Sequence, residues 1–414
     1  MKIQKQSSGD NCTNILAGGD VHVHNHVSLQ CLQTTIERME HPELKIHKDI
    51  IELIEKGDFQ SAQNCIDELV GNLSLKYSSE LLDLAVIQRL ISPEKSELLV
   101  TRAKKVAPDD PNILNVQALF LMDLGNISEA ETMFFKAINA SNKDEIKEKI
   151  AGNLGVLYKN NGNYSKAVDN LREAIKLAGK LRNDIGLIKH LNNLGACYHN
   201  IGEQENSLEV LQSALENSNK AIDSTEDIKT RKIVKSIQAS ILTNISISLK
   251  NKFRKSQDIE LLEKAKLNLE RAIDIEESLG NKELLGRHYG NLAEIYRQLN
   301  DKDKHEKYVK KCFDLFESSG TLKDRLTSKM NMGLFFSDYE EYSESLRYFE
   351  ELLSTSDLKN FPKLHVLTLI NASHSYQNTG LTGSSEKLIK EAKILAENHG
   401  LKYEVEYIDS LTKA

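Results

Sequence analysis

The sequence contains no tryptophan and only five prolines and five cysteines in 414 residues. Because proline interrupts helices, its scarcity favours a mostly helical chain. No two cysteines form a C-x-x-C pair, so we expect reduced thiols at Cys12, Cys31, Cys65, Cys197 and Cys312. No apolar run approaches the roughly 18 to 20 residues of a membrane span, and the polar start of the chain has no secretion-signal core. We therefore expect a cytoplasmic protein without a membrane partner.

The sequence also lacks an excess of positive charge and any recognised catalytic motif. Its 54 Lys and Arg against 61 Asp and Glu give a net charge of −7, which disfavours nucleic acid as a partner because phosphate binding needs a local excess of cations. It has no Gly-x-x-x-x-Gly-Lys-Ser/Thr phosphate loop, no His-Glu-x-x-His helix, no Gly-x-Ser-x-Gly elbow and no dinucleotide-binding glycine pattern. We expect a protein that is not an enzyme and needs no cofactor.

What the sequence does contain is an internal repeat. Asn-Leu-Gly-x-x-Tyr occurs at 153–158 and again, 40 residues later, at 193–198. Further copies begin at Asn244, Asn291, Asn331 and Asn371, the last three again 40 residues apart. The longer step before Asn244 places extra polar residues at 216–237, and shorter units with a 34-residue step precede residue 147. Repeats of this length are typical of stacked supersecondary units.

Each repeat predicts a helical hairpin. Gly155 and Tyr158 lie on one face of a first helix, where the small residue lets a second helix approach and the ring fills the space beside it. Ala167, Leu171 and Ala174 then form the buried stripe of that second helix. Because one hairpin cannot bury its apolar side alone, neighbours stack into a continuous core. We count about nine such hairpins.

This pattern resembles the tetratricopeptide repeat (TPR) family, whose standard unit has small and aromatic residues at these places. The 40-residue copies are similar to the lengthened subclass of kinesin light chains, LGN-type adaptors and bacterial Rap-type peptide-sensing regulators. The resemblance implies an all-α, right-handed superhelical solenoid. We expect three parts: an N-terminal segment at 1–30, partly degenerate repeats at 31–147 and the 40-residue array at 148–414. The sequence departs from the family pattern, and predicts looser packing, at His305, Cys312 and Leu352.

Two columns of mainly asparagine residues run through the C-terminal repeats. The first column precedes the Leu-Gly positions and consists of Asn153, Asn193, Asn244, Asn291, Asn331 and Asn371. The second column, seven residues on, consists of Asn160, Asn200, Asn251, Gln298, Asp338 and Asn378. Asparagine is a poor helix former, so such uniformity needs a reason. Each residue of a helix turns the side-chain direction by 100° about the helix axis, so a step of seven residues returns to within about 20° of the same direction. The packing residues of the same helix, such as Gly155 and Tyr158, point roughly 140° to 200° away from that direction. We predict that both columns point away from the packed side.

The resemblance implies that this side of the first helix lines the concave surface, where related 40-residue adaptors grip an extended peptide with asparagines. A carboxamide offers a donor and an acceptor together, which match the backbone N–H and C=O of such a peptide. We therefore predict that both columns bind a peptide or protein segment. The alternative is that each asparagine bonds to the backbone or to the next repeat and fixes the superhelical twist. The two roles are compatible.

Side chains beside the columns are expected to set specificity. Most of them are basic on a net acidic protein, which suggests an acidic or phosphorylated ligand, although solvated helix faces also carry lysine. We predict this role for Lys189, His199, Arg287, Arg297 and His374.

The N-terminal segment differs in composition from the helices. After the turn signal Gly18-Gly19, valines alternate with histidines as Val21, His22, Val23, His24, His26 and Val27. This alternation predicts a short β-hairpin with one apolar and one imidazole face. Because an isolated hairpin is marginal in water, we expect Val21, Val23 and Val27 to mediate homo-oligomerisation. The alternative is a metal site at His22, His24 and His26, but imidazoles about 6.6 Å apart need ligands from other chains to hold one ion.

Three functional hypotheses remain. The first is a non-enzymatic scaffold or sensor that binds an extended peptide or protein segment in the concave groove and self-associates through its N-terminus. The N-terminal segment is similar to Gly/Asn-rich leaders of bacterial defence proteins, which suggests antiphage signalling as its setting. The second is a receptor for a free signalling peptide, like the Rap-type regulators. The third is a metal-binding oligomer built on the N-terminal histidines.

Overall fold

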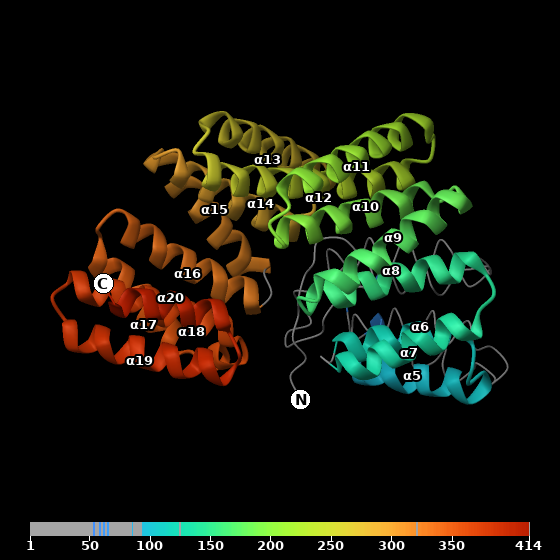
Figure 1. The fold of residues 1–414 in the computed structure, drawn as a ribbon, viewed down its shortest axis with the longest axis horizontal. Helices are drawn as coiled ribbons and strands as arrows, with labels where there is room; N and C mark the ends of the chain where they lie inside the picture. Colours follow the sequence, from blue (N-terminus) through green and yellow to red (C-terminus); the bar gives the residue numbers. More distant parts are fainter. Residues whose placement is uncertain are drawn as a thin grey trace. The chain divides into compact units, whose positions relative to one another are not determined.

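A computed structural model describes residues 53, 58, 61, 62, 64, 65, 85, 93–123, 126–319 and 322–413. Within these residues the chain is helical apart from the connecting loops, and there is no strand (Figure 1). The all-α prediction is confirmed for this part of the chain. The predicted β-hairpin lies outside the described residues, together with its valines and histidines. None of the described helices is both long enough and apolar enough to cross a membrane.

The chain divides into two compact units, Met1–His288 and Tyr289–Ala414. The described helices of unit 1 are α5 (Pro93–Val106), α6 (Pro111–Asp123), α7 (Ile127–Ala140), α8 (Asp144–Asn160), α9 (Tyr164–Leu181), α10 (Asp184–Asn200), α11 (Gln204–Ser224), α12 (Ile228–Ser256) and α13 (Ile259–Leu279). Consecutive helices pair as first and second helices of hairpins, beginning with α6 and α7 (Figure 1). The extra residues at 216–237 lengthen α11 to 21 residues and α12 to 29.

Unit 2 continues the same pattern of paired helices. The helix α14 (Lys282–Gln298) begins in unit 1, and it is followed by α15 (Lys302–Ser319), α16 (Leu322–Asp338), α17 (Tyr342–Ser354), the 3-10 helix η2 (Ser356–Asn360), α18 (Pro362–Asn378), α19 (Thr382–Asn398) and α20 (Lys402–Lys413). Seven complete hairpins lie within the described residues, from α6/α7 to α18/α19. The first two of the nine predicted hairpins fall largely outside them, and α5 is the second helix of one. The predicted boundary between 147 and 148 falls within α8.

Close approach of the paired helices explains the small residues of the repeat. A Cβ atom added at Gly155 would lie 2.5 Å from Leu171 Cγ, and one at Gly333 would lie 2.6 Å from Phe349 Cε1. Leu171 and Phe349 are fully buried, so the second helix fills the space that glycine leaves. After the first helix, Gly162 has a φ of 74° in the turn to α9, a conformation that other residues rarely adopt.

The three positions that depart from the TPR pattern are well packed. His305 is 4% exposed, Cys312 3% and Leu352 0%, so all three side chains lie in the core. The His305 ring lies edge-on to Phe335, with centroids 5.1 Å apart, and thus occupies space that a small residue would leave empty. Cys197 is buried as well, and burial raises its thiol pKa to about 11 and that of Cys312 to about 12. Both thiols are free and buried in the core.

Candidate functional site

In unit 1 the first column of asparagines joins consecutive first helices. Asn153 on α8 donates from Nδ2 to Oδ1 of Asn115 on α6, at 2.9 Å. Asn244 on α12 donates likewise to Asn192 on α10, also at 2.9 Å. Asn193 accepts a hydrogen bond at Oδ1 from Lys159 Nζ on α8, at 2.6 Å. These contacts fit the twist-fixing alternative, because each side chain links its own repeat to the preceding one.

Two of these asparagines do not point away from the packed side. Asn153 is 8% exposed and Asn193 is fully buried. Each of the two side chains contacts a residue of the neighbouring first helix, which covers it. The prediction of exposed side chains is therefore wrong at these two positions, and Asn244 is half-buried.

In unit 2 the first column has a different environment. Asn291 on α14, Asn331 on α16 and Asn371 on α18 are all half-buried. Their side-chain amides make no hydrogen bond to any residue that the structure describes. Each offers two N–H donors and one carbonyl acceptor at the same place in three successive first helices.

The second column is mixed in its contacts. Asn200 and Asn378 donate back to carbonyl oxygens four residues earlier in their own helices, at 2.7 and 2.8 Å. Asn160 and Asn251 are half-buried and make no side-chain hydrogen bond within the described part of the chain. The Gln298 Nε2 donates to Glu294 at 2.9 Å. This column is therefore less uniform in structure than in sequence.

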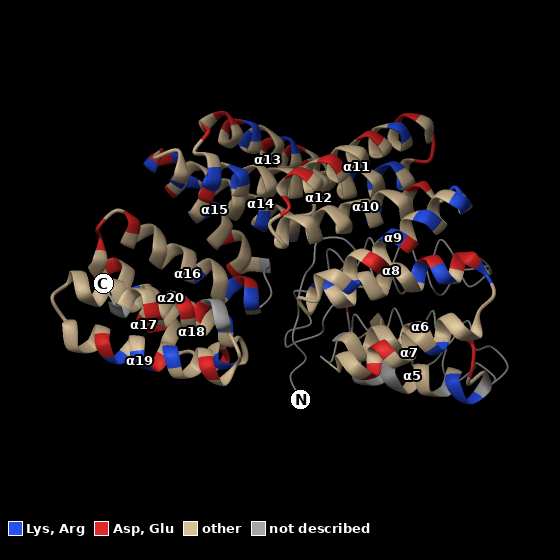
Figure 2. Ribbon diagram, in the orientation of Figure 1, with Lys and Arg blue, Asp and Glu red and all other residues tan. Residues whose placement is uncertain are grey.

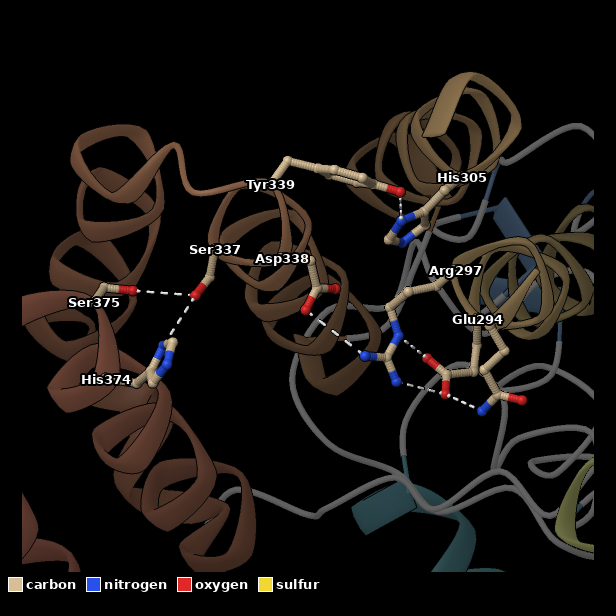
Figure 3. A network of polar contacts seen from close by, with 9 residues as sticks. Glu294, Arg297, His305, Ser337, Asp338, Tyr339, His374 and Ser375 are labelled. Carbon is tan, nitrogen blue, oxygen red and sulfur yellow. Dashed lines mark hydrogen bonds and ion pairs between the residues drawn. The ribbon is translucent and has the colours of Figure 1, made fainter. Parts of the chain in front are cut away.

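A charged cluster lies beside the unit 2 column (Figure 3). Arg297 donates two hydrogen bonds to Glu294, at 2.8 and 2.9 Å, while its Nη1 lies 3.7 Å from Asp338 Oδ1. Burial raises the pKa of the Asp338 carboxyl, and Arg297 opposes that rise. One guanidinium thus faces two carboxylates from two successive first helices.

Ser337 and His374 form another contact in Figure 3, with Oγ and Nδ1 3.4 Å apart. The arrangement is not that of a serine nucleophile and its base. Asn378 Nδ2 lies 3.3 Å from His374 Nε2 and can only donate, so Nε2 accepts and Nδ1 carries the proton toward Ser337. An Nδ1 that already holds a proton cannot remove one from the serine hydroxyl. Ser375 Oγ donates to Ser337 Oγ at 3.5 Å. Ser337, His374 and Ser375 therefore form a chain of polar contacts, and Ser337 and His374 are not a reactive pair.

The sequence matches a family model described as "Tetratricopeptide repeat" at residues 146–220, and a second model of the same description at 287–318. Tetratricopeptide repeats are therefore found in these two segments. The first match begins in α8 and ends in α11, and the second covers most of α14 and α15. A search of curated proteins found no match.

Several solved structures have a similar arrangement of TPR-like helices. The quorum sensor NprR from B. thuringiensis, in its apo form, is 12% identical with a TM-score of 0.59, over 86% of this chain and 99% of that one. The apo form of RapI is 14% identical with a TM-score of 0.53, over 70% and 99%. A STAND protein of Pyrococcus horikoshii with a tetratricopeptide repeat sensor is 14% identical with a TM-score of 0.57, over 93% of this chain and 55% of that one. At these identities the likeness shows the fold.

The basic side chains predicted to set specificity fall in both units of the TPR array. Lys189, His199 and Arg287 belong to unit 1, and Arg297 and His374 to unit 2. Lys189 and Arg287 are half-buried and have partners, and Arg297 is paired with Glu294. The N-terminal histidines lie outside the described residues, and within the described ranges no group of three or more His, Cys, Asp or Glu is placed to hold a metal ion.

Proposed function

We propose that this chain is a non-enzymatic TPR scaffold or sensor that binds an extended peptide or protein segment along the first helices of unit 2. The observation that supports this is the first column at Asn291, Asn331 and Asn371, whose three amides have no hydrogen-bond partner among the described residues. The amide atoms of these three residues stay open to solvent, so a ligand backbone can take the place of water as their hydrogen-bond partner. In unit 1 the side chains of Asn153, Asn193 and Asn244 each bond to the preceding repeat, so we assign the ligand to unit 2.

The spacing of the helices suits such a ligand. Packed helices lie roughly 8 to 10 Å apart, and an extended chain advances about 3.3 Å per residue. One amide therefore meets about every third peptide residue. Each neutral hydrogen bond adds only about 0.5 to 1.5 kcal/mol, so side-chain contacts must supply the rest.

A random peptide library selected on the full chain tests this proposal. For a selected peptide, we expect Asn331→Ala with Asn371→Ala to weaken binding at least tenfold while helicity stays unchanged. The matched control is Asn268→Ala, on the second helix α13, whose amide bonds to Lys264 O of its own helix. Two results would refute a site at the unit 2 column. Either the selected peptide binds the parent protein, the double variant and Asn268→Ala with equal affinity, or it loses affinity only for Asn268→Ala.

The second candidate is a receptor for a free signalling peptide. It is favoured by the likeness in fold to NprR, a quorum sensor, and to RapI. Both candidates require the unit 2 column, but they differ in the size of the ligand. A scaffold retains a large protein partner in a crosslinking pull-down, whereas a peptide receptor binds a free peptide with full affinity.

The N-terminal hypotheses remain proposals. We propose self-association through Val21, Val23 and Val27, with antiphage defence signalling as the setting. Light scattering of the full chain and of a variant without residues 1–30 tests self-association, because only the full chain is expected to form oligomers. Metal analysis of the full chain tests the alternative, a metal site at His22, His24 and His26. A metal site requires at least one bound ion per oligomer.

A further inference from the structure

A row of three lysines lies on α15, a second helix of unit 2. Lys304, Lys307 and Lys311 follow one another at steps of three and four residues and are all exposed. Residues at these steps share one face of a helix, so the row is about 10 Å long. We call these three residues the lysine row. It lies outside the proposed peptide site, which is on the first helices α14, α16 and α18.

The ammonium group of each lysine in the row lies over a tyrosine ring. The distances from Nζ to the ring centroid are 5.1 Å for Lys304 and Tyr296, 5.4 Å for Lys307 and Tyr308, and 4.9 Å for Lys311 and Tyr289. The Tyr308 centroid lies 5.5 Å from that of Tyr296 and 5.9 Å from that of Tyr289, so the three rings form one group. An aromatic ring attracts a cation through its quadrupole and does not neutralise the charge. The tyrosines therefore position the lysines and leave their charge available.

Other lysines of the same helix are paired with acids. Blue and red segments are interspersed along the described helices in Figure 2. On α15, Lys302 Nζ lies 3.3 Å from Glu341 Oε1. Lys310 Nζ lies 2.5 Å from Glu306 Oε1. This helix therefore carries both ion-paired lysines and lysines held over rings.

Lys307 and Lys311 differ from the paired lysines because neither has a carboxylate partner among the described residues. Asp303 and Asp314 lie within one turn of them along α15, yet in the described structure no ion pair joins either acid to the row. Lys304 Nζ lies 3.4 Å from Asp301 Oδ2, in a pair at the surface that contributes about 0 to 1 kcal/mol. The row thus presents three positioned ammonium groups, two of them without a counter-charge.

We infer that the lysine row docks an acidic segment of a partner protein, whose Asp or Glu carboxylates bind the ammonium groups. Each such contact is a charge-assisted hydrogen bond, and the tyrosines have already ordered the lysines that donate it. A helical segment with acids at the same steps of three and four residues matches the row. This inference does not depend on peptide binding along the first helices.

Two other anionic partners fit this face less well. Single-stranded nucleic acid is bound largely by stacking of its bases on aromatic rings, but Tyr289 and Tyr296 are only 8% and 4% exposed and lie beneath lysines. A membrane surface binds helices that also insert apolar side chains. None of the large apolar side chains that are exposed in the described ranges lies on α15. Carboxylates of a protein therefore match the row best.

Fluorescence anisotropy with the full chain tests the inference. The probe is a labelled, alanine-based helical peptide with glutamates at steps of three and four residues, and the blank is the same peptide with glutamines in their place. Labelled oligothymidylate of the same charge is the probe for nucleic acid. We expect saturable binding of the glutamate peptide that weakens at least threefold as salt is raised, because salt screens exposed charges. A glutamate peptide that binds no more tightly than the blank, or no more tightly than oligothymidylate, overturns the inference.

Variants assign the binding to the row. Lys307→Met with Lys311→Met is expected to weaken binding of the glutamate peptide at least fivefold, whereas Lys307→Arg with Lys311→Arg keeps the charge and the ring contact and retains binding. The matched control is Lys302→Met with Lys310→Met, which removes the same charge from the paired lysines of α15 and is expected to change binding less than twofold. If the control weakens binding as much as the methionine variant of the row, the inference is overturned. The asparagine variants that test the unit 2 column are expected to leave this binding unchanged, so the two proposals fail separately.

Discussion

Asn153 on α8 and Asn115 on α6 share a side-chain hydrogen bond of 2.9 Å, from an amide N–H to an amide carbonyl. The two residues belong to successive first helices, so the bond links one helical hairpin to the next. Asn331 occupies the same column in unit 2 and makes no such bond to the described residues. The first asparagine column therefore has two environments. In unit 1 its side chains bond to the preceding repeat, and in unit 2 its side-chain amides make no hydrogen bond to the described residues.

The first prediction follows from this difference. Asn153→Ala removes the donor and leaves the Asn115 carbonyl without its partner at a largely buried place, so we expect a loss of about 1 to 2 kcal/mol in the free energy of unfolding. Asn331→Ala removes an amide with no described partner and is expected to change stability by less than about 0.5 kcal/mol. Urea unfolding followed by circular dichroism measures both. Equal losses in the two variants would contradict the division of the column.

The hairpins were predictable because the residues that pair two helices recur in the sequence. Gly155 against Leu171 is such a case, and the small residue there alone indicates close approach. The environment of the asparagines was not predictable in the same way. Helical periodicity gives the direction of Asn153 around its own helix, but the neighbour that covers it, Asn115, lies in a repeat without the Asn-Leu-Gly motif. Glu294 lies three residues before Arg297 on α14, a spacing that predicts contact, but Asp338 comes from the next repeat and only the fold brings it to Arg297.

The second prediction concerns the close contact at Gly333. Gly333→Ala places a Cβ at 2.6 Å from the fully buried Phe349 ring, which must shift. Overpacking of this kind costs about 1 to 3 kcal/mol, and we expect a net loss of stability even though alanine favours helix by about 1 kcal/mol. Gly179, in α9, is exposed and has no atom within 4 Å of an added Cβ. Gly179→Ala is therefore expected to raise stability by about 0.5 to 1 kcal/mol.

Thermal unfolding of the two glycine variants distinguishes packing from helix propensity. If propensity decided both outcomes, both variants would melt above the parent protein. A lower melting temperature for Gly333→Ala alone supports the close contact.

A third prediction arises from a buried acid and histidine. Glu148 Oε1 on α8 lies 2.5 Å from His190 Nε2 on α10, with side chains 4% and 10% exposed. Asn183 donates to the other carboxylate oxygen at 3.2 Å. His190→Leu leaves a buried Glu148 oxygen without this hydrogen-bond partner, which costs about 1 to 3 kcal/mol. Glu148→Gln keeps the size and a polar contact, so we expect a smaller loss in urea unfolding. If Glu148→Gln lowered the free energy of unfolding more than His190→Leu, the contact between Glu148 and His190 would not be what determines stability at this place.

The last prediction is a dependence of stability on pH. Burial lowers the pKa of His199 to about 4, of His288 to about 3 and of His305 to about 4, each from an ordinary value near 6.5. Between about pH 6.5 and pH 4 the unfolded chain therefore binds protons at these histidines that the folded chain does not. Stability rises with pH wherever the unfolded state binds more protons, so we expect it to fall as the pH decreases through this range. Each such histidine contributes a slope of up to about 1.4 kcal/mol per pH unit.

His305 allows this dependence to be assigned to one residue of unit 2. Its Nδ1 lies 3.2 Å from the Tyr339 hydroxyl, so Tyr339→Phe removes the contact but keeps the titrating ring. We expect His305→Gln to flatten the plot of unfolding free energy against pH between 6.5 and 4, and Tyr339→Phe to lower stability without flattening it. Urea unfolding at half-unit pH intervals measures both slopes. If His305→Gln keeps the slope of the parent protein, the histidine is already protonated in the folded state, and its burial against Phe335 does not suppress its charge.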